Sequence, residues 1–214
     1  LTRLKEVENY GKNREIKILR PNAMIKKLHD EGIYVIARQT VFQDPILAKA
    51  RLDLALTSSS TGKQWLDNKK VMWGDPAGQE VWDYNIQIAK DALARGFDEL
   101  NFDYIRFPSD GNIDDIRYPF WDEKTLKRYV MRDFFKYIRR AFPNNKISAD
   151  LFGLVTVNYG DGGIGQNIDD AYHYFDAVAP MVYPSHFNKG FNGHQNPALY
   201  PYDVVYTSIL EANK

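Results

Sequence analysis

Helical patterns separate the extended segments of this chain from one another, and this alternation constrains the fold more than any other feature. Two helical stretches each end at a glycine, Gly32 or Gly96, and an extended apolar run follows each of them, residues 33–37 and 100–107. Glycine is the usual residue for the left-handed position that closes a helix. Strands that are joined through helices must pair in parallel, so the sequence predicts an α/β protein.

Two later segments repeat the same unit. A helical pattern over residues 126–142 stops before Pro143 and precedes the strand 146–152, and a short helix near 169–174 precedes the strand 177–183. Right-handed crossovers of this kind build either a closed barrel or an open doubly wound sheet. The first strand is not followed by the glycine-rich turn of nucleotide-binding open sheets. We therefore predict one domain over residues 1–214, a (β/α)8 barrel of the TIM type.

Charge and composition argue against several classes of partner. The chain has 28 basic and 28 acidic residues, so no net charge attracts nucleic acid. No stretch approaches the roughly 20 apolar residues of a membrane helix, so we expect no membrane insertion. Cysteine is absent and the histidines lack metal-ligand spacing. Asp110 begins a segment similar to a calcium loop, but Trp121 stands where the final Glu is needed. We predict neither a metal site nor a cofactor.

Polar residues gather where the predicted strands end, and in β/α barrels the active site forms at these ends. Side chains alternate along a strand, so Asn101 and Asp103 face one side while Leu100 and Phe102 face the other. Asp150 has the corresponding position on the following strand. Two neighbouring strands are therefore expected to direct Asp103 and Asp150 into one cavity.

Paired carboxylates carry out glycoside hydrolysis, one as nucleophile or base and the other as proton donor. We predict Asp103 as the nucleophile and Asp150 as the acid/base. Neighbouring strands lie about 4.8 Å apart, which favours the close carboxylate pair of retaining enzymes. The alternative is a purely structural role, in which Asp103 forms an ion pair with Arg38 or Arg106.

Other residues near strand ends are candidates for substrate binding. A further candidate strand, residues 71–76, contains Trp73 and ends in an acid, Asp75. Arg106 would orient Asp103 or bind a substrate hydroxyl or carboxylate, unless it is a solvated loop residue. His186 follows the strand 177–183 at the expected mouth, where loop packing is an equal alternative. Aromatic rings such as Trp73 stack on sugars. The predicted substrate-binding residues are Arg38, Trp73, Asp75, Arg106, Tyr183 and His186.

Three segments of the chain resemble a bacterial family of glycoside hydrolase-like domains that was long catalogued as a domain of unknown function. They are NFDYIRFPSDG at 101–111, ISADLFG at 147–153 and PMVYPSH at 180–186. The resemblance extends over nearly the whole chain. It implies a glycosidase-type barrel, usually of envelope or secreted proteins, with Asp103 at the end of the fourth strand as the catalytic acid.

Against that family's barrel, this chain lacks candidates for the first strand and the last two. Residues 1–20 are polar, and only the segment 203–210 remains after Pro201. We therefore expect an incomplete barrel in this chain. Because open strand edges attract further strands, we also expect an oligomer or complementation by a missing segment.

The predicted function is hydrolysis of O-glycosidic bonds in a polysaccharide. The alternative is a non-catalytic carbohydrate-binding or cell-envelope module that keeps the barrel, and a sugar lyase or deacetylase is a weaker third hypothesis. The expected location is extracellular or in the bacterial cell envelope, with a targeting signal outside this chain.

Overall fold

A four-stranded parallel sheet forms the centre of the chain. The computed structural model describes residues 4–11, 18–157 and 160–214. The sheet has the order β1-β3-β5-β6, and all three pairings are parallel. Each of its strands follows a helix, as the sequence predicts. The strands are β1 (Ile36–Thr40), β3 (Glu99–Asp103), β5 (Lys146–Phe152) and β6 (Ala177–Met181).

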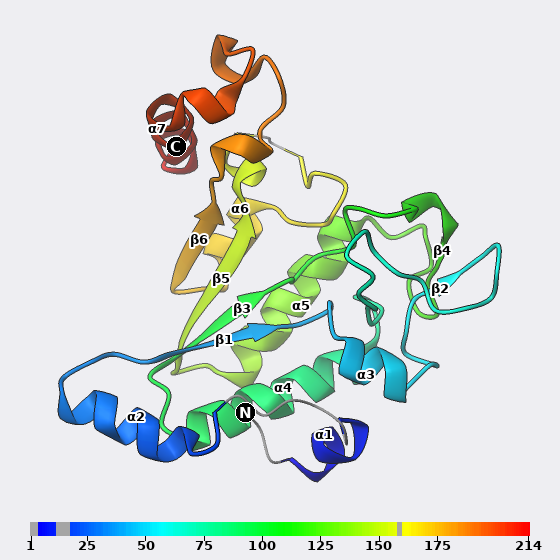
Figure 1. The fold of residues 1–214 in the computed structure, drawn as a ribbon, viewed down its shortest axis with the longest axis vertical. Coiled ribbons are helices and arrows are strands. Elements are labelled where there is room, and N and C mark those ends of the chain that lie inside the picture. Colours follow the sequence, from blue (N-terminus) through cyan, green and yellow to red (C-terminus); the bar gives the residue numbers. More distant parts are fainter. Residues whose placement is uncertain (1–3, 12–17, 158–159) are drawn as a thin grey trace.

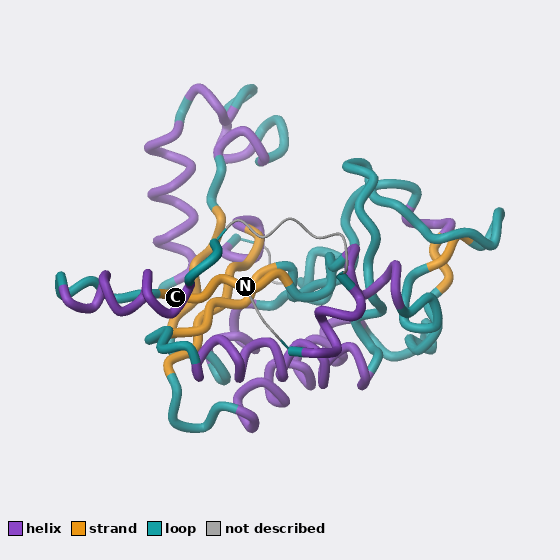
Figure 2. Tube along the Cα trace, turned by 60° about the horizontal axis from the view of Figure 1, so that its bottom comes forward, coloured by secondary structure: helices purple, strands orange, loops and turns teal. Residues whose placement is uncertain are grey.

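Helices cover one face of this sheet (Figures 1 and 2). The helices that precede the four strands are α2 (Pro21–Asp30), α4 (Gln79–Ala94), α5 (Lys127–Ala141) and α6 (Ile168–Tyr172). Apolar residues at helical spacing on α5, such as Phe134 and Ile138, are completely buried. From the sheet, Phe102 packs against Phe142 and Phe175. This packing fixes the β3 side chains that point toward the helices, and therefore also those that point away.

The remaining elements lie outside this layer. They are α1 (Lys5–Tyr10), α3 (Pro45–Ala50), α7 (Pro201–Ala212), the antiparallel pair β2 (Thr57–Ser58) and β4 (Ile116–Arg117), and short 3-10 turns at Ile113–Asp115, Gly153–Thr156, Pro184–His186, Phe191–Gly193 and Pro197–Leu199. In Figure 1 the β2-β4 pair lies on the far side of β1 and β3 from α7.

Several strand boundaries differ from the prediction. β1 starts at Ile36 rather than at residue 33, because its partner β3 starts at Glu99, the residue that pairs with Ile36. β3 ends at Asp103, since Tyr104 has a left-handed backbone with φ 54°. The predicted strand over residues 71–76 does not form. Only an isolated bridge between Gly74 and Ala55 occurs there.

The parallel sheet is open within the described residues. β1 and β6 are its two edges, so no strand of the described ranges connects them into a closed barrel. The incomplete barrel predicted from the sequence is confirmed. Beyond β6, α7 exposes Tyr202 and Tyr206, whose rings stack 5.8 Å apart. Complementation of this edge by another segment or another copy stays a prediction. None of the described helices meets the length and hydropathy that a membrane crossing requires.

Candidate active site

The two predicted catalytic acids lie on the sheet face that points away from the helices. Leu100 and Phe102 are buried against the helical layer, so Asn101 and Asp103 point to the opposite side. Ser148 of β5 pairs with Asn101 of β3. Two residues further along each strand, Asp150 therefore lies beside Asp103. The predicted alternation therefore holds on both strands.

A strained residue at the end of β3 positions Asp103. The left-handed backbone of Tyr104 is unfavourable for a residue with a side chain, and such strain is concentrated at functional sites. This conformation directs the Tyr104 N–H onto Asp103 Oδ1, at 2.6 Å. Only 2% of Asp103 is exposed. The turn thus fixes the orientation of a nearly buried carboxylate.

Arg38 of β1 connects the two acids. Its Nη2 forms an ion pair with Asp103 Oδ2, and its Nε donates to Asp150 Oδ2 at 3.1 Å. The other oxygen of Asp150 accepts a hydrogen bond of 3.0 Å from Asn101 Nδ2. The ion pair considered from the sequence for Asp103 therefore exists with Arg38. Because the Arg38 side chain is 55% exposed, this pair remains open to a ligand.

Burial raises the pKa of Asp103 above its ordinary value. The Tyr104 N–H and the charge of Arg38 lower the pKa, whereas the charge of Asp150 raises it further. The effect of burial prevails, so the carboxylate is more basic than one in water. A basic, oriented and partly desolvated carboxylate is suited to nucleophilic or acid/base chemistry.

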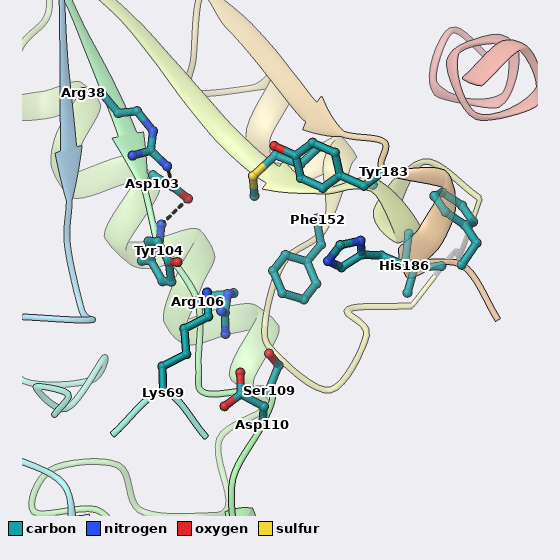
Figure 3. A pocket seen from close by; sticks show the side chains of 14 residues that line it. Arg38, Lys69, Asp103, Tyr104, Arg106, Ser109, Asp110, Phe152, Tyr183 and His186 are labelled. Atoms are coloured by element: carbon teal, nitrogen blue, oxygen red, sulfur yellow. Dashed lines mark hydrogen bonds and ion pairs between the residues drawn. The ribbon is translucent and has the colours of Figure 1, made fainter. Parts of the chain in front are cut away.

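A cavity of about 470 Å³ lies at the carboxyl ends of the strands, a size within the usual range of ligand pockets. Figure 3 shows Arg38 and Asp103 on one side of it, with Tyr183 and His186 across from them. The lining residues are Arg38, Lys69, Asp103, Tyr104, Arg106, Ser109, Asp110, Phe152, Gly153, Leu154, Met181, Tyr183, His186 and Phe187. Asp150 is not among them. Four of the predicted substrate-binding residues thus reach one cavity.

Close packing of β5 against β6 shapes the wall of this cavity. A Cβ atom on Gly153 would lie 2.6 Å from the carbonyl oxygen of Met181, so only glycine fits at the end of β5. Tyr183 and His186 follow β6 and are exposed, with ring centres 5.4 Å apart. Their position at the mouth agrees with the location predicted from the sequence.

Two predicted substrate-binding residues do not reach the cavity. Asp75 is completely buried, and its oxygens accept hydrogen bonds from the backbone N–H groups of Ala77, Phe120 and Trp121. Trp73 is only 1% exposed, so it cannot stack on a sugar. Both predictions depended on a strand over residues 71–76 that would have ended at the cavity. Without that strand, these residues belong to the core.

For Arg106 the structure excludes the alternative considered from the sequence. Arg106 is 5% exposed and lines the cavity, so it is not a solvated loop arginine. No role was predicted for Lys69, Tyr104 and Phe152, and Asp110 was considered only as a calcium ligand. Tyr104 and Asp110 lie within the distinctive segment 101–111, which was the available signal. Within the described ranges, no cluster of three or more metal-ligating side chains occurs.

The chain is similar to one known protein family and to several solved structures. Residues 2–214 match a family described as "Putative glycosyl hydrolase domain", and the chain belongs to this family. No curated protein matches the chain. A hypothetical protein from Ruminiclostridium thermocellum is 34% identical, with a TM-score of 0.62, over 70% of this chain and 74% of that one.

Two more distant structures share the fold. An α-galactosidase from Thermus thermophilus, solved with stachyose, is 15% identical with a TM-score of 0.55 over 89% of this chain and 38% of that chain. The glycoside hydrolase domain of PelA from Pseudomonas aeruginosa is 11% identical with a TM-score of 0.54, over 90% of this chain and 68% of that domain. The fold is therefore that of glycosidase barrels. This chain spans well under half of the galactosidase.

Replacing Arg38 by Gln should raise the pKa of Asp103 further. The charge of Arg38 lowers this pKa in the wild type, so its removal leaves the effect of burial less opposed. NMR titration of the Asp103 carboxyl carbon would measure the shift without any substrate. The carboxyl of Asp122, which lies at an exposed turn, should titrate unchanged. A lower pKa for Asp103 in the variant would contradict this electrostatic role of Arg38.

Proposed function

We propose that this domain hydrolyses O-glycosidic bonds of a polysaccharide, with Asp103 as the nucleophile. The observation that carries the proposal is the Asp103 carboxylate itself: nearly buried, held by the Tyr104 N–H and Arg38, and open to a cavity at the strand ends. Membership of a glycosyl hydrolase family supports it. We also propose an extracellular or envelope location, where such polysaccharides occur.

In the proposed reaction, Asp103 attacks the anomeric carbon while a second acid protonates the leaving oxygen. Water then hydrolyses the glycosyl ester, with the second carboxylate acting as base. Asp150 is our first assignment for this second group, because Arg38 links it to Asp103. Asp110 is the other candidate, since it lines the cavity whereas Asp150 does not.

Substitution of the two candidates by Asn should identify the acid/base. Loss of a general acid costs about 10²- to 10⁴-fold in rate on a substrate with a poor leaving group. A dinitrophenyl glycoside needs no proton, so its first step should be nearly unaffected by the same substitution. We expect Asp150→Asn to show this contrast and Asp110→Asn not to. The reverse result would transfer the role to Asp110.

The direct test is a panel of polysaccharides incubated with the wild-type chain, with new reducing ends as the readout. Cleavage of at least one glycan is expected. A specific observation favours a second function, a carbohydrate-binding module: Arg38 occupies oxygens of both Asp103 and Asp150. Binding of a glycan with no cleavage of any member of the panel would favour that module over the hydrolase.

A further inference from the structure

Arg106 is a buried cation that lines the cavity, and the proposed reaction assigns it no role. Its Cζ atom lies 4.5 Å from the ring centre of Phe152, 5.0 Å from that of Trp73 and 5.3 Å from that of Tyr104. Burial lowers the pKa of this guanidinium. Aromatic faces attract a cation but compensate only part of the cost of removing it from water. A buried cation is stable only when an anion or further hydrogen bonds replace the water that it has lost.

The described residues supply little of this compensation. Nη1 of Arg106 donates to the carbonyl oxygen of Phe107 at 3.0 Å. No carboxylate within the described ranges forms an ion pair with it. The acids that act on its charge, among them Asp103, Asp67 and Asp110, each accept hydrogen bonds from other groups. Arg106 lines the cavity, and apart from this Nη1 hydrogen bond its N–H donors have no acceptor among the described residues.

A second cation lies on the same side of the cavity. Lys69 is exposed, lines the cavity and has no ion pair with any residue that the structure describes. Figure 3 shows Lys69, Arg106 and Asp110 together, away from Arg38 and Asp103. Arg38 is committed to two carboxylates. The positive charge without an ion-pair partner among the described residues thus lies next to Tyr104, on the same side of the cavity as the proposed nucleophile.

We propose that Arg106, assisted by Lys69, binds an anionic group of the sugar, so that the substrate is an acidic polysaccharide. This inference rests on the proposed glycosidase function. A guanidinium fork binds a carboxylate or sulfate through two parallel hydrogen bonds, and the surrounding rings hold this fork in place. Asp110 also lines the cavity, and its negative charge limits the affinity for the anion.

Binding measured without turnover tests this site. Calorimetry with the Asp103→Asn variant would compare oligosaccharides of a uronic-acid polysaccharide with the same oligosaccharides after reduction of their carboxyl groups. We expect the acidic form to bind at least about 10-fold more tightly, as a charge-assisted hydrogen bond allows. Adding Arg106→Gln should abolish the preference, whereas Arg140→Gln, which removes an exposed arginine of α5, should retain it. Asp110→Asn should strengthen acidic binding.

Two further measurements distinguish a carboxylate from a sulfate as the bound anion and cover the case in which one variant does not fold. Oligosaccharides that carry sulfate instead of carboxylate would show which anion is preferred. If Arg106→Gln does not fold, Lys69→Met, at an exposed position, should reduce the preference. Equal binding of acidic and reduced glycans, or a preference that survives both substitutions, would overturn the proposal.

Failure of this inference differs from failure of the proposed function. Efficient hydrolysis of the reduced, neutral glycan would refute the acidic substrate class and leave the hydrolase standing. Binding of acidic glycans that depends on Arg106, with no cleavage of any glycan by the wild type, would support the anion site and refute the hydrolase.

Discussion

Replacement of Asp103 by Asn should lower hydrolysis of a cleaved polysaccharide by at least about 10³-fold, because removal of a catalytic nucleophile eliminates the covalent step. The amide has nearly the same shape, and its oxygen can still accept the Tyr104 N–H. Folding should therefore persist. Reducing-end assays at saturating and at low substrate would measure kcat and kcat/KM, and circular dichroism would verify the fold.

Asp133→Asn is the matched control for this variant. Asp133 is exposed on α5, so its substitution removes the same charge from the chain without touching the cavity. Its activity should equal that of the wild type. Undiminished activity of Asp103→Asn would eliminate Asp103 as the nucleophile, and the ion pair with Arg38 would then be a structural contact only.

The regular part of the fold was predictable because it follows from local periodicity. The strand at β5 was predicted with its observed ends, Lys146–Phe152, and the left-handed glycines Gly32 and Gly96 close their helices as expected. Alternation along β3 and β5 then placed Asp103 and Asp150 on one face. These features depend only on residues close in sequence.

Features that depend on distant contacts were not predictable. The segment 71–76 has the apolar character of a strand, but Asp67 bonds the indole of Trp73 and the backbone N–H of Val71, and this holds the segment as a loop. The left-handed backbone of Tyr104 has no signal in the residue type. The bridge from Arg38 to both acids required the register of β1 against β3. A single sequence does not contain these relations.

Asp75 illustrates how a polar residue near a predicted strand end can have a role in stability instead of binding. Asp75→Ala should lower the free energy of unfolding by about 3 kcal/mol, since three part-buried N–H groups would lose their buried acceptor at about 1 kcal/mol each. These N–H groups connect two loops, one at Ala77 and one at Phe120 and Trp121. Urea unfolding would measure the loss.

The matched control is Asp122→Ala, because Asp122 also accepts three hydrogen bonds but lies at an exposed turn where water can replace it. The loss of stability in Asp122→Ala should be much smaller.

Burial raises the pKa of Asp75, so the stability that its protonated form contributes is complete below the ordinary value of 3.8 and is lost as pH rises through the raised pKa. Asp75→Asn cannot titrate, so its deficit relative to the wild type should be larger at acidic than at neutral pH. If Asp75→Ala instead left stability intact and weakened glycan binding, the original prediction of a substrate-binding Asp75 would be restored.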